Sequence, residues 1–127
     1  MDMHNKEQTE DCINISMQDD SNIAVVNFRS SSICCSESIS TCSAEIRKLI
    51  EEKKPELLIF DFAGVKFFSS QVLGMLLESR TRAAEHKGKV VISSLSSQLH
   101  RVFKITSLDK IFEIYHDAQE AESALNK

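Results

Sequence analysis

Residues 57–77 have the sequence LLIFDFAGVKFFSSQVLGMLL, in which a polar break at Ser69 and Ser70 separates two apolar runs. The first run, residues 57–62, does not alternate and has the length of a strand that is buried on both faces. After the break, apolar residues recur with helical spacing on one broad side: Val72, Leu73, Met75, Leu76 and Leu77. The stretch therefore predicts a central strand followed by a helix over residues 71–86, packed deeply or against a partner.

The chain before this stretch predicts a hairpin and a helix. Residues 12–18 and 22–28 are two short candidate strands on either side of turn-forming residues, which is typical of a β-hairpin. Apolar residues with helical spacing begin near Glu37, and Pro55 forbids the helix from continuing.

The chain after this stretch continues the alternation. Gly88 is expected at the C-cap position of the second helix. There follow a strand at residues 89–93, a short helix within 95–105, a last strand or turn at 110–116, and a terminal helix that opens with a capping box at Asp117 and Glu120. The order predicts a single α/β domain in which helices pack on a mixed, mostly parallel sheet of four to five strands.

Length and composition fit one domain over residues 11–127, preceded by a flexible polar tail at residues 1–10. The net charge of −4 argues against a nucleic-acid partner, which would require a basic face. No apolar run reaches 18 residues and the N-terminal segment is acidic, so we expect neither a membrane span nor a signal peptide. A cytoplasmic location is expected.

Motifs for catalysis and for metal binding are poorly matched. The four cysteines form no CxxC pair and the four histidines are scattered, so inert thiols are favoured over a metal or redox role. Neither a nucleophile elbow nor a glycine-rich phosphate loop is present. We therefore expect no enzyme activity, no cofactor and no metal. An enzyme would have to use Cys34 or Cys35 as its nucleophile.

The serine pair has two interpretations. Serine before an apolar helix commonly caps it, because its hydroxyl accepts a hydrogen bond from a free backbone N–H, worth about 1 kcal/mol. A phosphate at the same place would gain about 0.3–1 kcal/mol from the helix dipole. It would also place a charge of roughly −1.5 to −2 on an apolar surface, where a covering partner would have to bury or repel it. Ser70 is thus a candidate phosphoacceptor.

The stretch from Asp61 to Gly74 resembles the signature of STAS domains, the anti-sigma factor antagonist family. The usual signature is Leu-Asp-Leu-Ser-Gly-Val, three further residues, and Asp-Ser-Ser-Gly-Leu-Gly. The residues that match in register and without a gap are Asp61, Gly64, Val65, Ser70, Leu73 and Gly74. The likeness covers about Ile13–Leu125 and is clear from Leu57 onward.

The resemblance implies a regulatory, phosphorylated signalling protein. In the family, the serine that corresponds to Ser70 is phosphorylated by a serine kinase of histidine-kinase-like fold that doubles as the anti-sigma factor. The unphosphorylated antagonist binds this kinase and frees a sigma factor for transcription, and a serine phosphatase resets the switch. The expected contact surface is the region Phe68–Glu78 with the neighbouring loop at residues 30–35. The expected partner-binding residues are Ser69, Gln71, Val72, Gly74, Met75, Glu78 and Cys34.

The sequence departs from the family pattern beside the phosphoacceptor. Ser69 replaces the usual aspartate, Gln71 and Val72 replace Ser or Thr and then Gly, and Cys34 stands about where another aspartate is usual. These departures keep an alternative open: a non-phosphorylated STAS scaffold or sensor module in a signalling complex.

Overall fold

The computed structural model describes residues 13–18, 22–28, 32–33 and 36–126, so the tail expected at residues 1–10 lies outside the described residues. Strands β1 (Ile13–Gln18) and β2 (Ile23–Phe28) form the predicted antiparallel hairpin. The remaining strands of the main sheet are β4 (Leu57–Asp61), β6 (Lys89–Ser93) and β7 (Glu113–Tyr115).

The main sheet is mixed and has the strand order β1-β2-β4-β6-β7. From β2 onward all neighbouring strands are parallel, and parallel neighbours need crossover connections that helices supply. The arrangement confirms the predicted α/β fold and its mixed, mostly parallel sheet, which has five strands where four to five were expected. The segment at residues 110–116, expected to be a strand or a turn, is both: a short 3-10 helix η1 (Leu108–Lys110) ends there and β7 follows.

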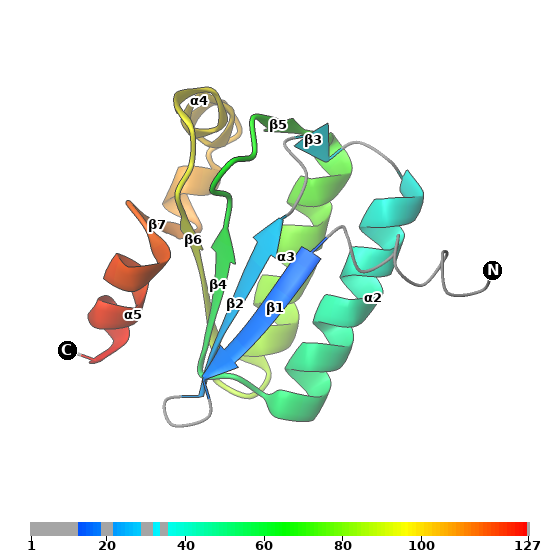
Figure 1. Ribbon diagram of the computed structural model, residues 1–127, viewed down its shortest axis with the longest axis vertical. Helices are drawn as coiled ribbons and strands as arrows, with labels where there is room; N and C mark the ends of the chain where they lie inside the picture. Colours follow the sequence, from blue (N-terminus) through cyan, green and yellow to red (C-terminus); the bar gives the residue numbers. More distant parts are fainter. Residues whose placement is uncertain (1–12, 19–21, 29–31, 34–35, 127) are drawn as a thin grey trace.

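The helices are α2 (Ser36–Lys53), α3 (Ser70–Ala84), α4 (Ser97–Ile105) and α5 (Ala118–Asn126). Figure 1 shows α2 and α3 side by side on one face of the sheet and α5 on the opposite face. As predicted, α2 ends before Pro55, and Lys54 takes a left-handed φ of 46° after the last turn.

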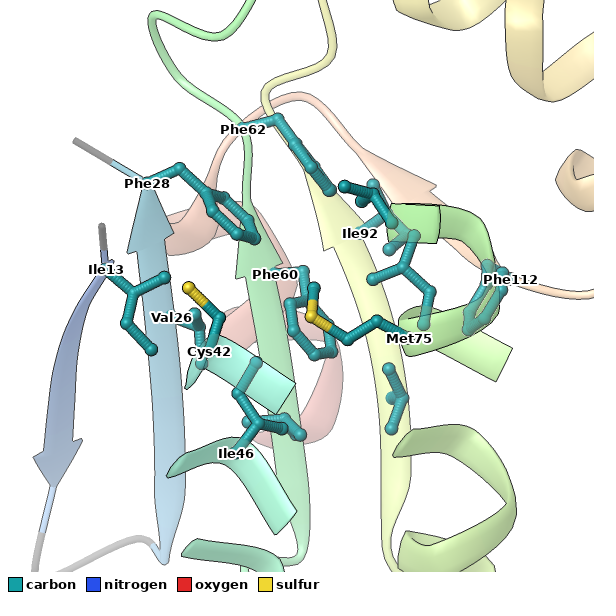
Figure 2. Packing of buried hydrophobic residues seen from close by; sticks show 14 of the residues in the cluster. Ile13, Val26, Phe28, Cys42, Ile46, Phe60, Phe62, Met75, Ile92 and Phe112 are labelled. Atoms are coloured by element: carbon teal, nitrogen blue, oxygen red, sulfur yellow. The ribbon is translucent and has the colours of Figure 1, made fainter. Parts of the chain in front are cut away.

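Burial on both faces explains the unbroken apolar run of β4. Successive side chains of a strand point to opposite faces. Phe60 therefore packs in the larger core with α2 and α3, whereas Ile59 packs with Ala121 of α5. Figure 2 shows the larger core, in which Met75 and Cys42 approach Phe60 from the two helices. Each such fully buried side chain contributes about 1.5–3 kcal/mol.

The predicted capping box at the start of α5 is present. The Glu120 N–H donates to Asp117 Oδ1 at 2.8 Å, and Glu120 Oε1 accepts from the His116 N–H at 2.9 Å. The reciprocal bond thus falls one residue before the usual position. The Glu120 amide is one that a helix start leaves free, whereas the His116 amide lies just before the N-cap residue.

The role expected for Gly88 is wrong. Lys87, not Gly88, adopts the left-handed conformation after α3, with φ of 67°. Gly88 instead donates its N–H to the Ala83 carbonyl at 2.8 Å, and a Cβ at this residue would lie 2.7 Å from the Pro55 carbonyl oxygen. Glycine is needed here because two backbone segments approach closely.

A second, two-stranded parallel sheet pairs β3 (Ser32–Ile33) with β5 (Phe67–Phe68). The sequence pattern did not predict this sheet. It lies at the same end of the molecule as the start of α3 (Figure 1). It therefore places Ser32 and Ile33 beside Phe67 and Phe68, the two residues directly before the serine pair.

Candidate functional site

The turn after β4 positions the start of α3. The Phe62 N–H donates to the Ser93 carbonyl at 2.9 Å, and the Val65 N–H donates to the Phe62 carbonyl at 3.0 Å. Gly64 has φ of 82°, a conformation that glycine adopts without strain. Phe68 then packs against Phe62 with ring centroids 5.5 Å apart. The first residue of α3 is thereby fixed at the carboxyl end of the sheet.

Ser69 is the N-cap of α3 by its backbone but not by its side chain. It has φ of −81° and ψ of 165°, yet its hydroxyl accepts no capping hydrogen bond. The Ser69 Oγ is shielded from solvent and has no hydrogen-bond partner among the residues that the structure describes. The expected capping role is therefore wrong for this hydroxyl, and the Val72 N–H bonds to the Ser69 carbonyl instead, at 3.0 Å.

Ser70 is the first residue of α3 and is exposed, as is Gln71. The first turn of α3 contains no acidic residue. The positive end of the helix dipole at this terminus is therefore not neutralised by a carboxylate of the same turn. The position is chemically suited to an anionic group on the Ser70 side chain.

The other residues expected at the contact surface divide into buried and accessible groups. Val72 is fully buried and Met75 is 4% exposed, so their side chains belong to the core and not to a contact surface. Gly74 is exposed, and a Cβ built there would meet no atom within 4 Å. Glu78 is half-buried. Cys34 lies outside the described residues.

The apolar pattern of α3 predicted a wider buried side than the structure has. Leu77 was expected to widen that side, but it is 39% exposed. Ser70, Gly74, Leu77 and Thr81 are exposed at spacings that place them on one face of a helix. We call these four residues the α3 stripe. The spacing of Leu77 from Ser70, two helical turns, was the signal available in the sequence.

An ion-pair network joins α2 to α3 beside the α3 stripe. Glu78 accepts from Arg47 at 3.1 Å and from Arg82 at 3.3 Å, and Arg82 also pairs with Glu51 at 3.0 Å. All four side chains remain partly exposed, so each pair adds little stability. The negative charge of Glu78 is therefore already compensated by the two arginines within the domain.

Asp61, a signature residue, ends β4. Its Oδ2 accepts from Asn27 Nδ2 at 2.9 Å, and its Oδ1 accepts from the Ala63 N–H at 3.2 Å. These bonds hold together the ends of β2 and β4 and the start of the turn that leads to α3. The role that the structure gives Asp61 is thus to shape the turn.

Other kinds of site were sought within the described ranges. There, no three His, Cys, Asp or Glu residues lie close enough together to hold a metal ion. Among the described residues, Cys42 forms no disulfide and lies in the core, 1% exposed. None of the helices in the described part of the chain combines the length and the apolar character needed to cross a membrane.

Comparison with known proteins places this chain in a family. Residues 14–121 match the STAS domain family, and the chain belongs to it. This range includes the strands of both sheets other than the first residue of β1, the whole of α3 and the serine pair.

Solved structures with the same fold include anti-sigma factor antagonists. An anti-sigma factor antagonist (STAS) domain protein from Planctomyces limnophilus is similar with a TM-score of 0.81 at 20% identity, over 91% of this chain and 98% of that one. The anti-sigma factor antagonist SpoIIAA in its unphosphorylated form gives a TM-score of 0.78 at 16% identity, over 90% and 96% of the two chains. SpoIIAA of Bacillus in its phosphorylated form gives 0.69 at 16% identity, over 89% and 98%. At such identities the likeness shows the fold.

Proposed function

We propose that this STAS domain is a cytoplasmic regulator that resembles anti-sigma factor antagonists in function. It binds an anti-sigma factor that is a serine kinase of histidine-kinase-like fold, and phosphorylation of Ser70 ends the interaction. A serine phosphatase restores the binding form. The observation that carries the proposal is the exposure of Ser70 at the first residue of α3, in a turn without acidic residues.

The α3 stripe supports a protein partner at this surface. Leu77 exposes 39% of its area, and Gly74 leaves the helix backbone uncovered although no internal atom requires a glycine there. An interior glycine costs a helix about 1 kcal/mol, so a closely approaching partner gives it a purpose. Val72 and Met75 support the surface from below, while Ser70, Gln71 and Gly74 contact the partner.

Phosphate chemistry supports the switch. A phosphate on Ser70 would add a charge of roughly −1.5 to −2 at one end of the α3 stripe. The helix dipole would stabilise it in the free protein, whereas a partner covering the stripe would have to desolvate it. Every 1.4 kcal/mol of this difference weakens binding about tenfold. The known existence of phosphorylated and unphosphorylated SpoIIAA is consistent with this chemistry in a relative of the same fold.

The chain contains its own control for phosphorylation. Ser97 is also the exposed first residue of a helix, follows a serine N-cap and precedes a glutamine, as Ser70 does. The wild type, Ser70→Ala and Ser97→Ala would be incubated with ATP and histidine-kinase-like serine kinases from the same genome, and mapped by mass spectrometry. Label at Ser70 that only Ser70→Ala abolishes is expected. A kinase that labels its own cognate antagonist but leaves this chain unmodified would overturn the switch.

A non-phosphorylated scaffold or sensor module is the second candidate, and Ser69 favours it. The family aspartate is replaced by a serine whose hydroxyl is buried, so a kinase that reads an acid before its acceptor finds none. This candidate predicts equal affinity of Ser70→Ala and Ser70→Asp for the partner, measured by calorimetry. Loss of binding only in Ser70→Asp would instead favour the switch.

A further inference from the structure

The edge strand β7 leaves part of its backbone unpaired. Among the strands that the structure describes, β7 pairs with β6 alone and ends the sheet. The Tyr115 carbonyl accepts from the Ser94 N–H at 3.1 Å, so the backbone N–H and C=O of Tyr115 point toward β6. Because neighbouring residues of a strand direct their N–H and C=O groups to opposite sides, Ile114 directs both groups to the open edge. An open edge of this kind can template one more strand.

Two hollows flank this edge and share residues of it. One, of about 340 Å³, lies between Arg80 and Ala84 of α3 and Ile111 and Glu113 beside the edge. The other, of about 570 Å³ and more open, runs along residues 109–115 themselves. Ile111, which lines both, is a large apolar residue that stays 43% exposed. We call this combined surface the β7 groove.

Arg80 gives the β7 groove a positive charge that no ion pair among the described residues compensates. Within the groove, Lys89 forms an ion pair with Glu113. The other two arginines of the α2–α3 region, Arg47 and Arg82, are paired with glutamates. Arg80, in contrast, forms no ion pair with any residue in the described part of the chain. The groove thus offers a free guanidinium, an apolar contact at Ile111 and an unpaired backbone.

We propose that the β7 groove binds an extended segment of a partner protein that adds a strand antiparallel or parallel to β7. The bound segment places an apolar side chain against Ile111 and Ala84 and an acidic side chain on Arg80. An extended backbone pairs with the N–H and C=O of Ile114 together, while the guanidinium favours a carboxylate. Main-chain hydrogen bonds supply affinity, and the hollow beside α3 supplies specificity.

This surface is separate from the one proposed for the kinase. Ser70 and Arg80 are ten residues apart on α3, which corresponds to about 15 Å along a helix axis. A segment in the β7 groove would therefore leave the N-terminal turn of α3 uncovered. The groove gives the domain a second contact, so it can join two proteins.

The test uses the full chain and a phage-displayed library of random dodecapeptides. Peptides that pair an apolar residue with a nearby Asp or Glu are expected to be selected. Arg80→Glu and Ile111→Glu should each weaken the binding of a synthesised selected peptide at least about tenfold. Lys87→Glu, which reverses an exposed charge, should not weaken it. Both groove residues are exposed, and a thermal melt checks that the variants fold.

Two further measurements distinguish strand addition from other occupants. Binding should slow the amide hydrogen exchange of Ile114. Methylating every second backbone nitrogen of the peptide should abolish binding when these nitrogens face β7 and should leave it intact when they face away. The proposal is overturned by a failure to enrich any peptide, or by peptides indifferent to Arg80→Glu and Ile111→Glu. The proposal is also overturned if citrate alone perturbs the signal of Arg80, because the groove would then be a simple anion site. It is overturned as well if sedimentation detects a homodimer that Ile111→Glu dissociates.

Discussion

Ser69 and Ser96 occupy the same position in two Ser-Ser-Gln tripeptides, but only the Ser96 hydroxyl caps its helix. Ser96 Oγ accepts from the Leu99 N–H at 3.3 Å, whereas Ser69 Oγ is buried without a partner among the described residues. Both residues have extended backbone angles suited to an N-cap. The difference lies in the surroundings, because Ser69 follows the small β3–β5 sheet and its side chain is enclosed.

This difference predicts unequal costs of removing the two hydroxyls. Ser96→Ala should lower the free energy of unfolding by about 1 kcal/mol, since a capping bond is lost. Ser69→Ala should leave it unchanged or raise it slightly, because an unsatisfied buried hydroxyl is removed. Urea denaturation of the two variants measures both values, and a larger loss in Ser69→Ala would contradict the assignment.

Gly74 and Gly88 should respond in opposite directions to alanine. Gly74→Ala should raise stability by about 0.5–1 kcal/mol, because the added methyl meets open space and glycine is a poor helix residue. Gly88→Ala should lower it, since its Cβ would lie 2.7 Å from the Pro55 carbonyl oxygen. Chemical denaturation compares them. If Gly74 is kept for a partner, the stabilised Gly74→Ala variant should also bind the kinase more weakly.

Glu78 should stabilise the packing of α2 against α3 by a small, salt-dependent amount. Glu78→Gln removes the charge shared by Arg47 and Arg82 and should cost up to about 1 kcal/mol, because the side chains are partly exposed. The loss should shrink in high salt, which screens the pairs. Glu52→Gln, an equal charge change at an exposed residue of α2, is the control. Equal unfolding curves for the two variants at low salt would rule out the network as a stabiliser.

Tyr115, the sole tyrosine, should titrate unusually late. The hydrogen bond that it donates to the Glu113 carboxylate raises the pKa of Tyr115 to about 12, above its ordinary value of about 10. Because the folded protein favours the neutral phenol, the resulting stabilisation is complete below about pH 10 and is lost as the pH rises through about 12.

Near-ultraviolet absorbance follows this titration while circular dichroism reports folding. Glu113→Gln should return the pKa of Tyr115 toward about 10, because the anionic acceptor is gone. Glu52→Gln should leave it unchanged. An ordinary pKa in the folded wild type would mean that the Tyr115–Glu113 bond does not persist in solution.

The sequence by itself determined the main architecture. The unbroken apolar run at residues 57–62, the helical spacing after Ser70 and the stop at Pro55 each depend on local rules of burial period and backbone geometry. The capping box at Asp117 and Glu120 is local in the same way. Such features are visible without neighbours, because the residues that interact are close along the chain.

Only the tertiary structure decided which residues of the candidate site are accessible. Val72, Met75 and Leu77 are equally apolar in sequence, yet the sheet and α2 bury the first two and leave Leu77 exposed. Contacts between distant segments likewise produced the β3–β5 sheet, the burial of the Ser69 hydroxyl and the close approach of Pro55 to Gly88. Local pattern predicted the main strands and helices. The small β3–β5 sheet and the exposure of each side chain depend instead on what packs against them, which residues far away along the chain determine.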